Sequence, residues 1–148
     1  MTTLDDLAAL FRPETGLATL SVARPDASVH SSLVNAGLLA HPLSGEPVAG
    51  VVVRSDAAKM ALLRRAGRAT LCWRSGWRWI TLEGGVALVG PNDPLAGFDP
   101  AGLPALLRAV YQGCGGVHDD WSEFDRVMAA ERRAAVLVAP GRLYTNRA

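Results

Sequence analysis

The segment Val51–Lys59 brings together residue types that could hold an anion. Its apolar first half indicates the end of a buried strand, Ser55 can cap a following helix, and Arg54 and Lys59 flank that cap. A helix N-terminus presents unpaired N–H groups and a partial positive charge, to which neighbouring cations add. Asp56 in the same turn opposes this field. The spacing therefore indicates either a phosphate cradle or an ordinary capped helix with solvated charges.

A second cationic cluster, Arg64, Arg65 and Arg68, lies at the end of the same predicted helix and just beyond it. Guanidinium groups bind carboxylates and phosphates in a bidentate manner, so this cluster could guide the anionic tail of a ligand. A solvated helix face is the commoner role of such a run, and the residues alone leave both roles open.

Three of the four tryptophans lie in one predicted hairpin, Trp73–Trp79. Trp77 and Trp79 are expected to share one strand face, and Ser75-Gly76 is predicted to form the two-residue turn. Indole rings placed there could stack on a planar ligand, or they could seal a core or a subunit interface.

Metal sites and the common nucleophilic motifs have no support in the sequence. His30, His41 and His118 are scattered, and Cys72 and Cys114 lie far apart without metal-ligand spacing, so no metal is expected and both thiols are predicted to be free. A GxSxG motif is absent, which argues against a serine hydrolase. No residue is singled out as a catalytic acid or base.

Composition excludes several classes of protein. The chain has 148 residues, 49% of them hydrophobic and 20% charged, which predicts one globular domain over residues 1–148. A formal net charge of +1 argues against a nucleic-acid partner. The apolar runs are too short to span a membrane, and Met1–Asp6 lacks the features of a signal peptide. A cytoplasmic location is therefore expected.

Hydrophobic periodicity and turn signals predict a chain of hairpin-linked strands with a few short helices. Helices are expected over Thr3–Phe11, Ser55–Ala66, Leu103–Gln112 and Trp121–Arg132. Strands are expected over Leu17–Ala23, Val29–Leu39, Val48–Val53, Arg68–Trp73, Trp77–Val89 with a bend at Gly84-Gly85, and a last strand made of Ala134–Ala139 and Arg142–Thr145. This order indicates an α+β or mostly-β barrel, and the absence of GxGxxG after a strand disfavours a Rossmann fold.

Five stretches of the chain match motifs of a known superfamily. They are Leu17–Asp26, Lys59 with Leu63 and Arg68–Leu71, Leu82–Gly84, Gly115–Trp121, and Arg132–Val138 running into Arg142–Tyr144. On these residues the chain resembles the split β-barrel flavin and deazaflavin oxidoreductases, the superfamily of pyridoxamine 5′-phosphate oxidase. The last two stretches resemble its actinobacterial branch, which uses the deazaflavin coenzyme F-420.

The resemblance implies a mostly-β, six-stranded split β-barrel with short flanking helices, assembled as a homodimer with cofactor sites at the subunit interface. It places the lysine at the position of Lys59 on the cofactor phosphate. It also implies that the cofactor site includes Val52, Val53, Arg54, Ser32, Asn35 and Trp77. For a deazaflavin cofactor we further expect backbone groups as far as Ser55 at the ring or ribityl chain, and Arg64 at the acidic tail. Relatives often carry another basic residue where this chain has Ala57 and Ala58. The chain also lacks the arginine- and histidine-bearing C-terminal segment that holds the substrate in pyridoxamine phosphate oxidases, which argues against oxidation of vitamin B6.

Three functions fit this resemblance. The leading hypothesis is an F-420-dependent oxidoreductase that transfers a hydride from the reduced deazaflavin to an unsaturated small molecule, with the protein supplying orientation and an anion anchor. An FMN-binding flavoprotein of the pyridoxamine oxidase type is the first alternative. A carrier that binds flavin or haem without catalysis is the second. Whether Tyr111 or His118 takes part is left open.

Overall fold

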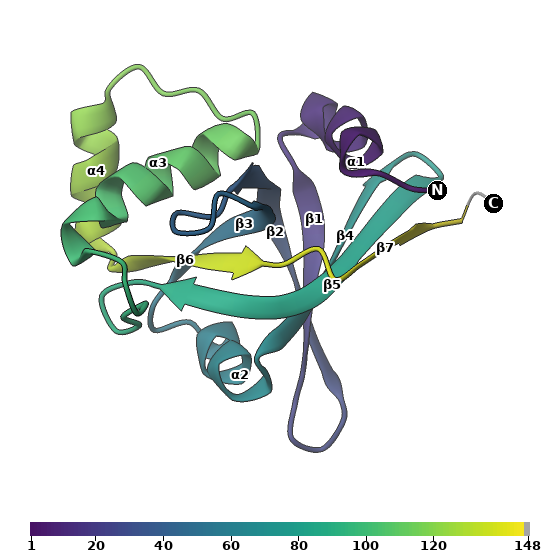
Figure 1. Ribbon diagram of the computed structural model, residues 1–148, viewed down its shortest axis with the longest axis horizontal. Coiled ribbons are helices and arrows are strands. Elements are labelled where there is room, and N and C mark those ends of the chain that lie inside the picture. The colour runs from purple at the N-terminus through teal and green to yellow at the C-terminus, as the bar shows by residue number, and fades with distance from the viewer. Residues whose placement is uncertain (147–148) are drawn as a thin grey trace.

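The chain folds into short strands and helices separated by turns, as the turn signals of the sequence predict. The structure is a computed structural model that describes residues 1–146, and within them it has four α-helices and seven strands (Figure 1). The helices are α1 (Leu4–Phe11), α2 (Ala58–Ala66), α3 (Leu103–Gly113) and α4 (Trp121–Ala130). The strands are β1 (Leu17–Ala23), β2 (Val29–Ala40), β3 (Pro47–Arg54), β4 (Arg68–Ser75), β5 (Arg78–Val89), β6 (Arg133–Val138) and β7 (Arg142–Thr145).

Six of these strands close into an antiparallel barrel in the order β4-β1-β2-β3-β6-β5, because β5 also pairs with β4. The predicted six-stranded barrel is therefore confirmed. The prediction of a single last strand over Ala134–Ala139 and Arg142–Thr145 is wrong. Strand β6 pairs with β3 and with β5. Strand β7 pairs with a different part of β5, at Ile80–Glu83. Pro140 separates the two segments, and proline cannot donate the hydrogen bond that would continue a ladder.

Strand β5 changes partner at Gly84-Gly85, where the sequence predicts a bend. Up to Gly85 it pairs with β4, and from Val86 it pairs with β6. A Cβ on Gly84 would clash with the carbonyl oxygen of Ala139, so only glycine allows the chain leaving β6 to cross so closely.

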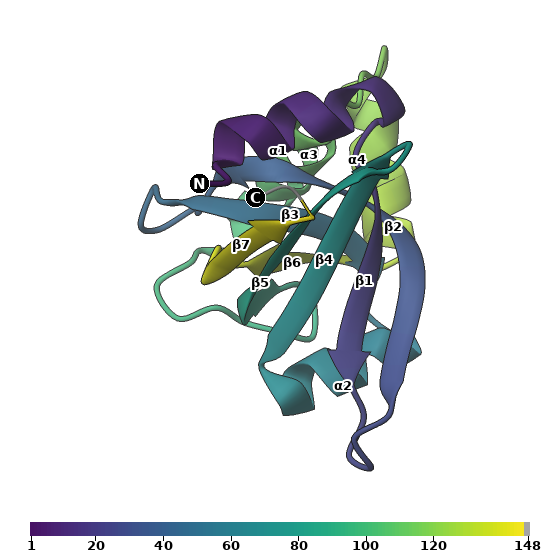
Figure 2. The same cartoon turned by 90° about the vertical axis from the view of Figure 1, so that its right-hand side faces the viewer.

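The barrel interior is filled by alternate residues of the strands and sealed at one end by α1 (Figure 2). Trp73 is fully buried, donates from Nε1 to the Ala36 carbonyl over 2.9 Å, and stacks on Phe11 with a centroid separation of 6.0 Å. Thr3 caps α1 in a capping box with Asp6, as the sequence predicts for the cap. Helix α1 therefore holds one end of the barrel closed.

Helices α3 and α4 pack against each other at one side of the barrel and cover the outer face of β3 and β6 (Figure 1). Their apolar side chains bury Val48, Ala135 and Leu137, so β3 and β6 are buried on both faces. Arg108 of α3 joins Asp125 of α4 through an Nε–Oδ1 contact of 2.9 Å. This pair fixes the two helices relative to each other.

Two local predictions need correction. Helix α2 begins at Ala58 with Ala57 as its N-cap and no side-chain cap, because Ser55 is buried inside the preceding turn. The hairpin between β4 and β5 turns through Gly76 and Trp77, one residue later than predicted. Gly76 has a φ of +61°, a conformation that glycine adopts without strain and that fixes the position of this turn.

Across residues 1–146, no helix is both long and apolar enough to cross a membrane.

Candidate functional site

The barrel is split between β2 and β3. The ladder between these two strands ends at Ala36 and Val51, beyond which β2 continues along β1 and β3 continues along β6. The backbone groups of a strand point alternately to its two sides, so the edge of β3 that faces the split carries N–H and C=O groups without a ladder partner. A ligand lying in the split can therefore bind main-chain groups as well as side chains.

A cleft of about 530 Å³ occupies this split. It is lined by β2 and β3, by the start of α2 and by the first residue of β6. Helices α3 and α4 line it from the other side. The lining residues are Leu33, Val34, Asn35, Val52, Val53, Arg54, Ala57, Lys59, Val110, Tyr111, Cys114, Met128 and Arg133. Five residues that the resemblance places in the site are thus brought together here: Asn35, Val52, Val53, Arg54 and Lys59.

Lys59 is a half-buried cation in this cleft. Its Nζ donates to Ser32 Oγ over 2.7 Å, which places Ser32 beside the cleft as predicted, and no carboxylate of residues 1–146 forms an ion pair with it. Burial lowers the pKa of Lys59 below the ordinary lysine value. A desolvated ammonium group without a counterion provides a strong binding point for an anion.

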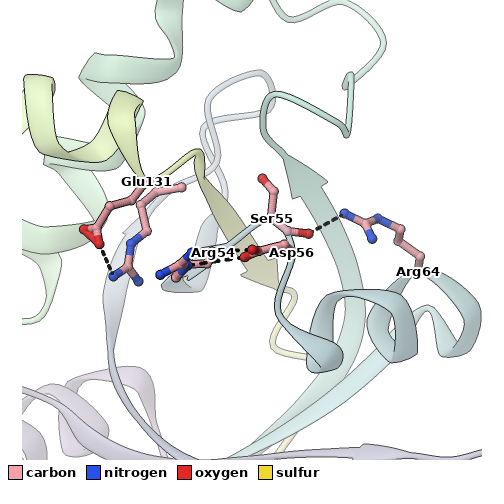
Figure 3. A network of polar contacts seen from close by, with 6 residues as sticks. Arg54, Ser55, Asp56, Arg64 and Glu131 are labelled. Atoms are coloured by element: carbon pink, nitrogen blue, oxygen red, sulfur yellow. Dashed lines mark hydrogen bonds and ion pairs between the residues drawn. The ribbon is translucent and has the colours of Figure 1, made fainter.

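Two arginines reinforce this positive charge. Arg54 and Arg133 lie directly opposite each other on β3 and β6, where like charges repel. Each is partly compensated by a nearby carboxylate. Arg54 pairs with Asp56 at 3.3 Å (Figure 3). Arg133 pairs with Glu131 at 3.2 Å.

Arg133 was not singled out from the sequence as a site residue. Its Nε is buried and has no hydrogen-bond partner within residues 1–146, and leaving such a donor unsatisfied costs about 1–3 kcal/mol. A ligand atom that accepts a hydrogen bond would remove that penalty. No local pattern in the sequence points to Arg133, because the register of β3 against β6 that brings it to the cleft joins distant parts of the chain.

Ser55 plays a different role from the predicted cap. It is 4% exposed, its Oγ has no hydrogen-bond partner within residues 1–146, and its carbonyl accepts from Arg64 Nη2 over 3.2 Å (Figure 3). Arg64 also binds both carboxylate oxygens of Asp93, at 2.7 and 2.9 Å. The Arg64 guanidinium therefore fixes the turn after β5 to the turn after β3, and Arg64 does not line the cleft.

Trp77 does not line the cleft that Lys59 lines. It is 92% exposed and lines a second cavity of about 770 Å³ on the outer face of β1, β4, β5 and β7. Trp77 belongs to the turn rather than to the predicted strand, and it lines this cavity together with Trp79.

The cleft has little chemistry of its own. Cys114 is buried, donates from Sγ to the Val110 carbonyl over 3.4 Å, and has its pKa raised to about 11 by burial, so it remains a thiol at neutral pH. The part of the chain that the structure describes contains no group of three His, Cys, Asp or Glu side chains able to hold a metal ion. The arrangement can bind an anionic, partly apolar ligand, and a reaction here would depend on that ligand.

No family model matches this sequence. Solved structures match it over nearly its whole length. A conserved hypothetical protein of Mycobacterium tuberculosis superposes with a TM-score of 0.68 at 17% identity, over 98% of this chain and 84% of that one. An FMN-binding, pyridoxamine 5′-phosphate oxidase-related protein of Nostoc punctiforme gives 0.62 at 13% identity, over 88% and 73%. An F-420 reductase gives 0.60 at 14% identity, over 92% and 94%.

The chain has the split-barrel fold of the pyridoxamine 5′-phosphate oxidase-like proteins. The resemblance inferred from the five sequence stretches is thereby confirmed at the level of fold. In this split barrel three cations, Arg54, Lys59 and Arg133, line the cleft between β2 and β3, whereas Arg74 is the one cation among the residues that line the larger outer cavity.

Proposed function

We propose that this split barrel is an F-420-dependent reductase that reduces an unsaturated small molecule. The observation that carries the proposal is the half-buried Lys59 ammonium group, which lacks a carboxylate partner within residues 1–146 and faces a cleft large enough for a tricyclic ring. The buried Nε of Arg133 adds a hydrogen-bond donor that has no acceptor within residues 1–146.

The residues present fit a flavin-type cofactor. Lys59 and Arg54 would hold its phosphate, and the free edge of β3 at Val52 and Val53 would meet the polar rim of its ring. Asn35 is already oriented, because its side-chain amide donates to the Thr15 carbonyl over 3.0 Å. When bound, the reduced deazaflavin supplies a hydride equivalent.

The protein's part in the reaction is binding and exclusion of water. The apolar walls contributed by Val110 and Met128 keep water from the split, and the cations neutralise the ligand's charge. An alkene conjugated to a carbonyl accepts the hydride at its β-carbon, and its α-carbon, next to the carbonyl, takes a proton from water. The alkene gains two electrons and two hydrogens. The hydride brings both electrons, and loss of the ring N–H proton of the reduced deazaflavin to water offsets the proton that the alkene takes from water.

FMN is the alternative cofactor. The Gly115–Trp121 stretch, which resembles the F-420 branch, favours the deazaflavin. The acidic tail of F-420 also gives a role to Arg65 and Arg68, which are exposed, whereas Arg64 is already held by Asp93. Replacing Arg65 and Arg68 together by alanine should weaken F-420 binding and leave FMN binding unchanged.

The activity is tested by mixing the protein with reduced F-420 and benzylideneacetone, an aromatic ketone with an activated double bond, and following oxidation of the cofactor. We expect oxidation that depends on both protein and alkene, with 4-phenyl-2-butanone as product. Cofactor binding without any turnover on this and other activated alkenes would contradict the reductase and support a carrier.

We further propose that the protein is a homodimer formed through the outer face of the barrel. A row of uncharged residues crosses five paired strands on that face: Leu33, Thr19, Cys72, Thr81 and Tyr144. Leu33 is 70% exposed, and Leu17, Trp77 and Tyr144 are also exposed. Exposed apolar patches of this kind are typical of interfaces, and a two-fold axis would bury the same patch on both copies.

Substituting Leu17→Glu should break this dimer, because it buries a carboxylate in each half of the interface. Leu43→Glu is the matched control, since Leu43 is exposed in the turn after β2, whereas Leu17 lies on β1 two residues from Thr19 of the row. We expect sedimentation analysis to show a dimer for the wild type and Leu43→Glu, and at least tenfold weaker association for Leu17→Glu. A monomeric wild type, or an intact Leu17→Glu dimer, would contradict this interface.

A further inference from the structure

A smaller pocket of about 230 Å³ adjoins the cleft, and we call it the annex. It shares Val52, Tyr111 and Met128 with the cleft, so the two spaces meet at a common wall. Its other lining residues come from α4 and the connection before it: His118, Glu123, Phe124 and Val127. The proposed cofactor site makes no use of these four residues.

The walls of the annex are aromatic and hold one another in place. The Phe124 ring lies 5.1 Å from Tyr111 and 5.6 Å from His118, measured between centroids. Tyr111 is fixed further, because its hydroxyl donates to the Val117 carbonyl over 3.3 Å and Gly116 packs directly against its ring. A preformed apolar pocket with aromatic walls suits a planar ring, which can make offset or edge contacts with them.

His118 gives the annex one hydrogen-bond donor. Its Nδ1 accepts from the backbone N–H of Asp120 over 3.0 Å. In the neutral ring this places the proton on Nε2, which can donate to a carbonyl oxygen. A donor to that oxygen also draws electrons from a conjugated alkene and prepares it to accept a hydride.

The two spaces differ in their charge. Glu123 lines the annex and is ion-paired with Arg126, which holds the pKa of this carboxyl below its ordinary value, so Glu123 is charged at neutral pH. The cleft carries Arg54, Lys59 and Arg133 instead. An anionic ligand is therefore favoured in the cleft, whereas the annex, whose only carboxylate is ion-paired, suits a neutral molecule.

We propose that the annex is the substrate pocket and takes a neutral, planar molecule in which an aromatic ring is conjugated to an alkene and a carbonyl. The aromatic walls bind the ring, and His118 donates to the carbonyl oxygen. The alkene meets the cleft at the wall shared by Val52, Tyr111 and Met128. This inference rests on the proposed function, because the cleft must hold the hydride donor.

The test uses a variant whose side chain fills the annex, and it compares the binding of benzylideneacetone with the binding of F-420. Val127→Phe places a ring in the pocket, and Ala129→Phe makes a comparable change at an exposed position of α4 outside it. We expect Val127→Phe to weaken binding of benzylideneacetone at least tenfold by NMR titration and to change F-420 affinity less than twofold. Ala129→Phe should change neither.

A second variant tests the donor. His118→Leu should weaken binding of benzylideneacetone several-fold and leave binding of β-methylstyrene, which has no carbonyl, unchanged. Wild-type affinity for benzylideneacetone in both Val127→Phe and His118→Leu would overturn the substrate pocket. Absence of F-420 binding in the wild type would overturn the proposed function instead, and the titrations of the cofactor-free protein would still decide whether the annex takes this class of ligand.

Discussion

Replacing Lys59 by alanine is expected to weaken binding of the anionic cofactor roughly 10- to 150-fold. The physical reason is the loss of one charge-assisted hydrogen bond to the phosphate, which contributes about 1.5–3 kcal/mol. Lys59 is half-buried, and its Nζ is held toward the cleft by Ser32 at 2.7 Å, so little solvent screening reduces this contribution. Isothermal titration calorimetry of the variant measures the effect directly.

Arg12→Ala is the charge-matched control for Lys59→Ala. Arg12 is exposed in the short turn after α1 (η1, Arg12–Glu14) and does not line the cleft, so its removal changes the net charge by the same amount. The control should keep wild-type affinity within about twofold, because exposed charges far from a ligand are screened by salt. Equal losses in both variants would mean that only net charge matters, and unchanged affinity in Lys59→Ala would remove it as the anchor.

Substituting Gly37→Ala is expected to destabilise the fold by about 1–3 kcal/mol, the usual effect of overpacking. A Cβ on Gly37 in β2 would clash with the backbone of Gly113, where α3 ends. Backbone atoms cannot rotate away, so α3 must shift. Because Tyr111 and Cys114 line the cleft from this end of α3, the shift should also weaken cofactor binding.

Gly85→Ala is the control for this substitution, since the nearest atom that a Cβ would meet there is 3.9 Å away. Thermal and chemical denaturation should show a lower midpoint for Gly37→Ala and little change for Gly85→Ala. Equal stability of Gly37→Ala and the wild type would show that α3 does not depend on this close approach.

The sequence predicts most of the barrel because local signals fix it. Turn residues and alternating apolar residues set the hairpins, and these determine which strands pair. Lys59 could be placed because a buried strand and a helix start are both visible around it. The break between β6 and β7 was missed because Pro140 sits inside a run that otherwise reads as one strand.

The parts of the site that sequence reasoning missed depend on long-range contacts. Arg133 enters the cleft only because β6 pairs with β3 in a register that brings it opposite Arg54. Ser55 is a preferred capping residue, yet it is buried in the turn before α2, and the helix begins at Ala58. The sequence leaves the Arg64 guanidinium available for a ligand, but the fold places Asp93 beside it, and the two form an ion pair. None of these contacts leaves a local pattern in the sequence.

The central claim is that the split between β2 and β3 binds a deazaflavin. The most direct measurement is a calorimetric titration of the purified, cofactor-free protein with F-420 and with FMN under the same conditions. We expect F-420 to bind more tightly than FMN, with one site per chain. Tight FMN binding with weak F-420 binding would make the protein an FMN flavoprotein, and binding of neither would contradict the assignment of the cleft.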